Sequence, residues 1–423
     1  MNPPVSRGAS LALVTLLTVV PVAAQPPPPL APAEQRQSYD QVVAGLRSPV
    51  AEERVDALRA LGATGYPDVI APIAALLTDP EDRIQLEAVN TLLTLYHVEK
   101  PVIVKRRGLI VETRAPSAAG SIYDLGPYGL IPQPVPIELT NGLAQAMFDK
   151  SRRVRLEAVY ALGVMARPPL DQYAADALAR TLQDPSADVR EAAARVIGGL
   201  RVTTAGDALV AALNDKEHRV SAAAMRSLGD IKAWQSLQAL TDQFTFYKGK
   251  GPRAEAAFDA LARIAHASTQ PLFLQHLSSN NAYLRRLAAE GLARSGNREA
   301  AQAVPTTLAG EKDRGAQLAA AFAGAVGGGP MAANHALTLI EALDNGAHHE
   351  QAMGYLVELG VRAMPGISNG LGNTDPVTRE RAVMVLGFIG GGEAFDLLER
   401  ARSDSDLRVV RAAERAIARL RKG

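Results

Sequence analysis

The sequence predicts an all-α fold, an α-solenoid of about eleven helical hairpins with one irregular insertion. Three observations lead to this prediction. One pattern of residues returns about every 31 positions along most of the chain. Apolar residues make up 47% of the 423 positions but aromatic residues only 4%, which suits helices that pack closely through small side chains. Every unit of the pattern also keeps an alanine at the same place, where two helices would touch.

Composition excludes several classes of function. The chain has no cysteine, which rules out disulfides, thiolate metal ligands and a cysteine nucleophile. Its 45 Lys and Arg residues nearly balance 44 Asp and Glu residues, so the formal charge is +1. Nucleic-acid binding needs a basic excess that releases counterions from the phosphate backbone. We therefore expect no nucleic-acid partner.

Residues 1–24 have the three parts of a secretory signal peptide. Arg7 gives the positive start, residues 9–20 form an apolar core, and small residues ending at Ala24 precede Gln25. A membrane anchor is the alternative, but the core is shorter than the ~20 apolar residues of a spanning helix, and a proline ends it. We expect cleavage between Ala24 and Gln25, a periplasmic or secreted protein, and no transmembrane segment in the mature chain.

A proline-rich linker is expected at residues 25–37. Pro26 to Pro29 fix the backbone and lack N–H donors, so this segment should stay extended rather than pack into a core. The folded part should begin near Ser38, and the solenoid would then span residues 38–423.

The repeating unit is defined by one anchor residue. The anchors are Gly62, Leu93, Gly163, Gly198, Gly229, Ala262, Ala293, Gly324, Val357, Gly387 and Ala418. Their spacing runs from 30 to 33 residues, except for one gap of 70 and one of 35. Alanine stands five residues before every anchor, and Leu or Ile stands one residue before ten of the eleven. We expect all eleven alanines to be buried against a neighbouring helix, with the larger side chain filling the space beside them.

Each unit should fold as a helix, a polar turn and a second helix. In the second unit we expect the first helix over residues 68–77, a cap at Asp79 and the second helix over residues 83–95. Five glycines, each three residues after its anchor, should end helices in the left-handed conformation; they are Gly65, Gly296, Gly327, Gly360 and Gly390. No hairpin buries its apolar face alone, so the stack forms one continuous core.

The clearest unit reads Asp-Pro-Ser-Ala-Asp-Val-Arg over residues 184–190, followed by Ala193 and by Val-Ile-Gly over residues 196–198. This pattern resembles the HEAT repeat, particularly the short variety also found in phycobilisome bilin lyases. The resemblance implies a scaffold, an adaptor or, rarely, a lyase-type enzyme. The family's ladder of Asp and Arg is matched by Asp149 with Arg155, Asp184 with Arg190, and the arginines Arg54, Arg285 and Arg379, whereas Ser221, Ala254 and Ala316 interrupt it. We interpret the ladder as bonding between repeats rather than ligand contact.

The gap of 70 residues is one repeat plus an insertion at residues 99–135. Two β-prone runs, 102–104 and 109–111, flank the basic segment 105–108, which predicts a β-hairpin with a basic turn. Loops longer than about 15 residues are uncommon in compact arrays and are often functional. A passive surface excursion is the alternative.

Positions seven and three residues before each anchor should point away from the core and line the concave face. In the first five units these positions combine apolar residues, a tyrosine and arginines, as protein-binding hot spots do. The predicted partner-binding residues are Arg59, Leu86, Leu156, Tyr160, Arg195 and Arg226, together with Arg106, Arg107, Tyr123 and Tyr128 of the insertion. The insertion is either a contact element or a lid that covers Leu86 and Leu156.

Several patterns only resemble catalytic or metal sites. Residues 366–370 read Gly-x-Ser-x-Gly, but no strand precedes the serine as a hydrolase nucleophile requires. The glycines of residues 324–329 lack the Gly-Lys-Ser/Thr ending of a phosphate loop and should form a turn. His348 and His349 have no third ligand at zinc spacing, and Asp404 occupies a capping position. Trp234, the only tryptophan, is expected to be a packing residue. We expect no catalytic, cofactor-binding or metal-binding residues and no cofactor.

The sequence thus predicts an exported scaffold that binds a protein or peptide on its concave N-terminal face. One alternative is an enzyme or small-molecule binder of the lyase type, with carboxylates such as Glu191 and Asp259 in a groove. Export argues against this alternative because bilin attachment is intracellular. Another is a structural subunit of an envelope assembly.

Overall fold

The computed structural model describes residues 32–96, 117–124, 133–249, 251–344 and 346–422. Within these ranges the chain is helical and forms no strand, which confirms the all-α fold. The helices are α1 (Pro32–Gly45), α2 (Ala51–Gly62), α3 (Ile70–Ala74), α4 (Asp82–Tyr96), α5 (Ala118–Asp124), α6 (Ile137–Ala146), α7 (Arg152–Met165), α8 (Gln172–Thr181), α9 (Ala187–Gly199), α10 (Gly206–Ala212), α11 (His218–Asp230), α12 (Leu237–Tyr247), α13 (Pro252–Ile264), α14 (Gln270–His276), α15 (Ala282–Arg294), α16 (Arg298–Thr307), α17 (Arg314–Gly327), α18 (Ala332–Glu341), α19 (His349–Leu359), α20 (Met364–Gly370), α21 (Pro376–Ile389), α22 (Gly391–Ala401) and α23 (Leu407–Lys422).

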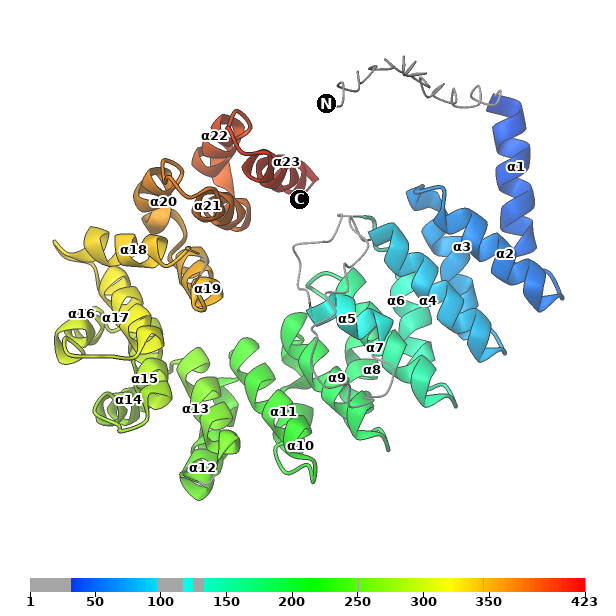
Figure 1. The fold of residues 1–423 in the computed structure, drawn as a ribbon. Helices are drawn as coiled ribbons and strands as arrows, with labels where there is room; N and C mark the ends of the chain where they lie inside the picture. Colours follow the sequence, from blue (N-terminus) through cyan, green and yellow to red (C-terminus); the bar gives the residue numbers. More distant parts are fainter. Residues whose placement is uncertain (1–31, 97–116, 125–132, 250, 345, 423) are drawn as a thin grey trace, which may run out of the picture.

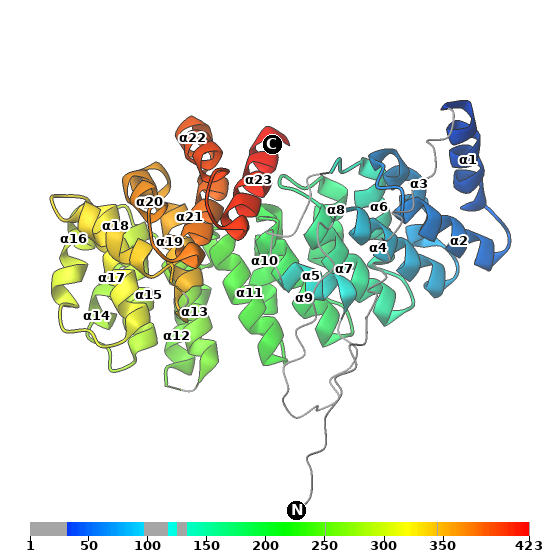
Figure 2. The same ribbon diagram turned by 45° about the horizontal axis from the view of Figure 1, so that its top comes forward.

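These helices pair into eleven hairpins, with α5 as the one helix outside the pairing among the described residues. The hairpins stack into a curved array (Figure 1). The first helices, such as α10, α12, α14 and α16, lie on the outer side of the curve, and the second helices, such as α11, α13, α15 and α17, lie on the inner side. Figure 2 shows the same second helices side by side along the array. The inner helices therefore form the concave face.

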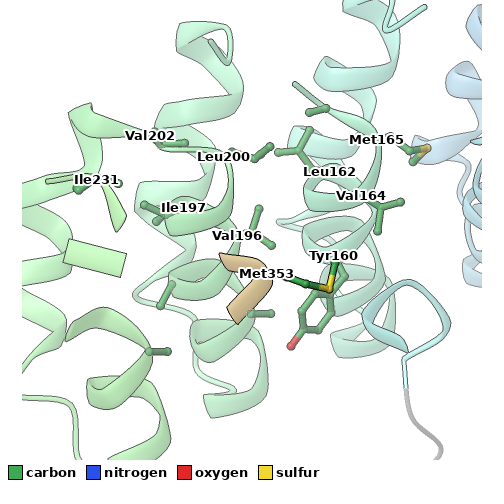
Figure 3. Packing of buried hydrophobic residues seen from close by; sticks show 14 of the residues in the cluster. Tyr160, Leu162, Val164, Met165, Val196, Ile197, Leu200, Val202, Ile231 and Met353 are labelled. Atoms are coloured by element: carbon green, nitrogen blue, oxygen red, sulfur yellow. The ribbon is translucent and has the colours of Figure 1, made fainter. Parts of the chain in front are cut away.

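The expected burial of the repeated alanine is confirmed in all eleven units. The alanines are Ala57, Ala88, Ala158, Ala193, Ala224, Ala257, Ala288, Ala319, Ala352, Ala382 and Ala413, and none is more than 6% exposed. The anchors also sit at close contacts. A methyl group at Gly163 would lie 2.7 Å from a methyl of Val196 on the next inner helix. Figure 3 shows Val196 between α7 and α9, beside Leu162. Small residues thus set the spacing of the inner helices.

The Arg ladder bonds adjacent repeats, as interpreted from the sequence. Arg190 donates to both carboxylate oxygens of Asp215 in the next unit, at 2.7 and 2.9 Å, and to the carbonyl of Asp184 in its own turn. The carboxylate in turn accepts from a backbone N–H of its own turn, that of Glu217. The corresponding pairs are Arg54 with Asp79, Arg155 with Asp184, Arg285 with Glu311, and Arg379 with Asp404. Each arginine therefore joins two turns, its own through carbonyls and the next through a carboxylate.

The insertion does not break this ladder. Gln85, which stands at the ladder position of the second unit, donates to Asp149 of the third unit at 3.0 Å. Helix α6 also packs on α3 and on the 3-10 turn Ala75–Thr78 that follows it, where a methyl group at Gly142 would lie 2.9 Å from Leu77. The array thus continues directly from the second hairpin to the third.

Helix ends follow the expected rule with one correction. Gly65, Gly296, Gly360 and Gly390 have φ values between 60° and 78°. The prediction for Gly327 is wrong: it remains the last residue of α17, and Gly328 takes the left-handed conformation at 82°. One extra helical residue shifts the stop because either neighbouring glycine can adopt positive φ.

Two other boundaries differ from expectation. Helix α1 begins at Pro32, six residues before the expected start at Ser38, because proline is compatible with the first turn of a helix. The first helix of the second unit is present from Pro67 to Thr78 but as three short pieces, with the 3-10 turns Pro67–Val69 and Ala75–Thr78 on either side of α3. Among the described residues, no helix has both the length and the apolar character that a bilayer span requires.

Candidate binding site on the concave face

Helix α5 is the helical part of the insertion among the described residues, and it packs on the array. It lies on the inner side of α7 and α9 (Figure 1) and contacts α7 and α4. Glu157 of α7 is buried and accepts hydrogen bonds from the first two backbone N–H groups of α5, those of Ala118 at 3.1 Å and Ala119 at 2.9 Å. A carboxylate at a helix N-terminus satisfies donors that have no partner within the helix. This contact fixes where α5 begins.

Tyr123 fixes the other end of α5. Its hydroxyl donates to the backbone carbonyl of Arg195 at 2.8 Å, and its ring lies 5.5 Å from that of Tyr160. Burial raises the pKa of Tyr123 to about 12, so the phenol stays neutral and remains a donor. Methyl groups at Gly163 and Gly199 would lie 2.8 and 2.5 Å from Tyr123. These two glycines therefore provide the space into which the ring fits.

Arg195 completes the attachment. Its guanidinium lies over the rings of Tyr123 and Tyr160, at 5.3 and 5.7 Å from their centroids, and donates to the Tyr160 hydroxyl at 3.2 Å. It also forms a 2.5 Å ion pair with Asp124, the last residue of α5. Cation–π contacts of this kind gain strength where water is excluded. Three of the predicted binding residues, Tyr123, Tyr160 and Arg195, are thus brought together, and they hold the insertion in place.

A cavity of about 250 Å³ opens beside α5. Its lining comes from α5 and from three consecutive inner helices: Ser117, Gly120, Ser121, Asp124, Arg152, Leu156, Tyr160, Asp188, Glu191 and Arg219. We call it the concave cavity. It combines charges of both signs with the apolar side chain of Leu156 and the edge of Tyr160, so its surface is suited to an extended segment with mixed side chains.

Ion pairs between repeats form one wall of the concave cavity. Asp188 in the first turn of α9 pairs with Arg152 of α7 and with Arg219 of α11, the latter at 2.5 Å. Arg219 also binds Glu191 at 2.9 Å. The same register carries the Arg83–Glu52 pair, at 2.7 Å, on the first two inner helices. The guanidinium groups of Arg152 and Arg219 are about half exposed to water, so these ion pairs fix the positions of the side chains more than they add stability.

The other predicted binding residues do not converge on this cavity. Arg59 is exposed and pairs with Glu87 at 3.0 Å, and Arg226 is exposed on α11. Leu156 lines the concave cavity, while Leu86 is half-buried against the core. Arg106, Arg107 and Tyr128, like the predicted β-hairpin, lie outside the described residues.

The expectation that position three before each anchor faces the concave solvent is wrong in four units. Tyr160, Asp259, Glu290 and Ala321 are all buried, none more than 9% exposed. Tyr160 is covered by α5. Asp259 and Glu290 are covered because neighbouring arginines fold over them: Arg263 binds Asp259 at 2.9 Å.

Glu290 is the centre of a second polar cluster, on the C-terminal half of the concave face. It accepts from Arg294 at 3.0 Å and from the hydroxyl of Tyr355 at 2.5 Å, and Arg294 continues to Glu358 at 2.8 Å. Burial raises the pKa of Asp259, and Arg263 opposes that effect. Glu191 and Asp259, the carboxylates of the enzyme alternative, are not brought together, since Glu191 lines the concave cavity and Asp259 belongs with Arg263.

The turn expected at residues 324–329 is wrong for Gly324 and Gly327, which belong to helix α17. Residues 366–370 lie within helix α20, so Ser368 is not on a strand-to-helix turn. Among the described residues no group of three or more His, Asp or Glu side chains is close enough to hold a metal ion. The prediction for Trp234 is wrong: it begins a 3-10 turn before α12 and is 67% exposed.

The sequence analysis missed Arg152, Asp188, Arg219 and helix α5. A signal for the first three was present, because charged residues recur in the first turn of consecutive second helices. For α5 the signal was weak, since seven residues with two alanines, a glycine and a serine have no helical periodicity to detect.

The fold and this site define an α-solenoid repeat protein with an inserted helix on its concave face. Residues 174–245 match the family model described as HEAT repeats, and residues 53–79 match the model described as PBS lyase HEAT-like repeat. The comparison with curated proteins found no match.

Among solved structures, an engineered protein shares 20% identity over 90% of this chain and 98% of its own, with a TM-score of 0.36. Human deoxyhypusine hydroxylase in complex with glycerol shares 20% over 67% of this chain and 96% of its own, with a TM-score of 0.29. The complex of CpcE and CpcF of phycocyanin lyase from Nostoc sp. shares 20% over 60% of this chain and 96% of its own, with a TM-score of 0.40.

Proposed function

We propose that this chain is an exported HEAT-repeat adaptor that binds a protein or peptide partner in the concave cavity of its N-terminal half. The observation that supports it is the position of α5, which leaves the repeating array and builds a walled cavity with α7, α9 and α11. HEAT repeats generally mediate protein interactions. A cavity with a few apolar contacts and several charged side chains would hold a short segment of a partner chain.

The role proposed is binding rather than catalysis. Glu191 is held by Arg219 at 2.9 Å, and Asp124 is held by Arg195. Carboxylates in such pairs recognise cationic or amide groups of a partner by exchanging their arginine contacts. Since the lining carries Asp124, Asp188 and Glu191 against Arg152 and Arg219, the segment bound there should be polar with a basic side chain.

The test separates the cavity from the attachment of α5. Ser121 is exposed and faces the cavity, so Ser121→Trp should fill it without loosening Tyr123. The variant should lose at least about tenfold in affinity for a partner captured from envelope extract while its melting temperature stays unchanged. Tyr173→Ala, on the outer helix α8 where Tyr173 is 50% exposed, is the matched control and should bind as the wild type does. Equal binding by Ser121→Trp would place the partner elsewhere.

The location is tested independently. We expect the secreted form to begin at Gln25, from the signal pattern of residues 1–24. Intact mass spectrometry of the periplasmic or culture fraction measures this directly. A full-length chain that still carries Met1 in the membrane fraction would contradict the proposed export.

A further inference from the structure

A second cavity, of about 310 Å³, lies between the end of α17 and helices α16, α18 and α20. We call it the C-terminal cavity. Its volume is at the small end of the range for ligand pockets, roughly 300–1,000 Å³. Eight of its thirteen lining residues are Ala, Val, Leu or Pro, among them Val326, Ala336, Leu337 and Leu359. The interior therefore favours an apolar group.

The two glycine-rich motifs of the sequence meet at this cavity. Gly328 comes from the cluster that ends α17, and Gly366 and Asn369 come from the Gly-x-Ser-x-Gly segment of α20. A methyl group at Gly366 would lie 2.5 Å from the Cδ1 atom of Ile340, so glycine lets α18 and α20 approach. These glycines shape a pocket, and neither serves as a phosphate loop or a nucleophile turn.

Two arginines give the cavity a charge. Arg298 and Arg362 line it, and no described residue of the lining is acidic. Neither arginine has a carboxylate within ion-pair distance in the described part of the chain. Arg362 gives one N–H to the Val326 carbonyl, at 3.4 Å, and a guanidinium has five such donors. The concave cavity, by contrast, has more acidic than basic side chains.

We propose that the C-terminal cavity binds a small carboxylate with an apolar tail. The carboxylate would lie against Arg298 and Arg362, which match its two oxygens with planar, paired donors. The apolar tail would lie against Val326, Ala336, Leu337 and Leu359. A phosphate monoester would fit poorly, since most of the wall offers no donor. A neutral apolar molecule would leave both guanidiniums without a carboxylate to pair with.

Titration of the intact protein with octanoate, 1-octanol and octylamine, followed by calorimetry, tests the site. Octanoate should bind, octanol should bind about tenfold more weakly, and octylammonium should not bind. Arg298→Gln and Arg362→Gln should each weaken octanoate by about five- to tenfold. Arg314→Gln, an exposed arginine at the opposite end of α17, is the matched control and should leave the affinity unchanged.

A third variant tests the apolar part without altering charge. Ala333 is exposed and lines the cavity, so Ala333→Trp should block it and remove octanoate binding with an unchanged melting temperature. Equal affinity for octanoate and octanol, or octanoate binding that survives the double substitution of Arg298 and Arg362, would overturn the proposal. So would tighter binding of a peptide ending in a free leucine carboxylate than of octanoate, since the ligand would then be a protein C-terminus. Ser121→Trp should not affect any of these titrations, so failure here is distinct from failure of the proposed adaptor function.

Discussion

Arg201, Lys232 and Ala265 hold left-handed backbone, with φ between 52° and 55°, although none is glycine. Each stands three residues after its anchor, where other units use glycine. A side chain with a Cβ atom in this conformation costs about 1–2 kcal/mol. The sequence could predict where helices stop, because the spacing from the anchor is constant. It could not show that the residue three after the anchor keeps the left-handed conformation when it is not glycine.

Ala265→Gly should therefore stabilise the protein by about 0.5–1 kcal/mol, because the relief of strain exceeds the entropy of the added glycine. Thermal unfolding measures the change. Ala256→Gly, inside α13, is the control and should destabilise by about 1 kcal/mol. If Ala265→Gly and Ala256→Gly destabilise the protein equally, the turn at Ala265 is not strained.

Ala193 is fully buried at the contact of α9 with its neighbours. Ala193→Leu should overpack that contact and cost about 1–3 kcal/mol. The change is measured as a lower melting temperature. Ala222→Leu, on the half-buried face of α11, should have a smaller effect. An unchanged melting temperature for Ala193→Leu would contradict the packing role assigned to the repeated alanine.

At the level of elements, the turns between repeats depend on the ladder. The sequence identified the arginines, but a pattern within one unit does not show which acid each one binds. Arg155 donates to the backbone carbonyls of Asp149 and Lys150 in its own turn, and it gives two hydrogen bonds to the carboxylate of Asp184 in the next. Which acid lies opposite each arginine depends on how two neighbouring units stack, and the sequence of a single repeat does not specify that. Helix α5 was missed for a related reason: its contacts, Glu157 and Arg195, lie far away in sequence.

The ladder predicts a loss of stability in acid. Hydrogen bonds from Arg285 lower the pKa of Glu311 to about 2, from 4.5 in the unfolded chain. A depressed pKa gives stability that is complete above about pH 4.5 and declines as pH falls toward 2. The melting temperature should therefore fall steadily across this window. Glu311→Gln should lower the melting temperature at pH 7, and the melting temperature of the variant should depend less on pH between 4.5 and 2. If the variant and the wild type show the same pH dependence, other groups cause the acid sensitivity.

Across the whole molecule, helices α15 and α19 bond to each other past α17, through Tyr355 with Glu290 and Glu358 with Arg294. Ala321 of α17, three residues before its anchor, is small and 5% exposed, which leaves room for these side chains to meet. Contacts between second neighbours are absent from a simple repeat model, in which each unit touches only the next. They brace the C-terminal half of the curve (Figure 1).

If these contacts brace the array, changes to the α15–α19 contacts should alter both the curvature of the array and its melting temperature. Burial raises the pKa of Tyr355 well above 10, so the phenol is neutral and donates to the Glu290 carboxylate. Tyr355→Phe combined with Glu358→Gln removes both bridges, and Ala321→Leu inserts a wedge between α15 and α19 at a cost of about 1–3 kcal/mol. Small-angle scattering should then show a larger radius of gyration for each variant, with unchanged helical content by circular dichroism.

Tyr173→Phe, on the outer helix α8, is the control for these measurements, since its ring is exposed and far along the chain from the bridge. The double variant removes attractive contacts between α15 and α19, whereas Ala321→Leu adds bulk between them. If both variants have a larger radius of gyration, the distance between α15 and α19 controls the curvature. A lower melting temperature with an unchanged radius of gyration would instead mean that these contacts stabilise three helices locally and that first-neighbour packing alone sets the curve.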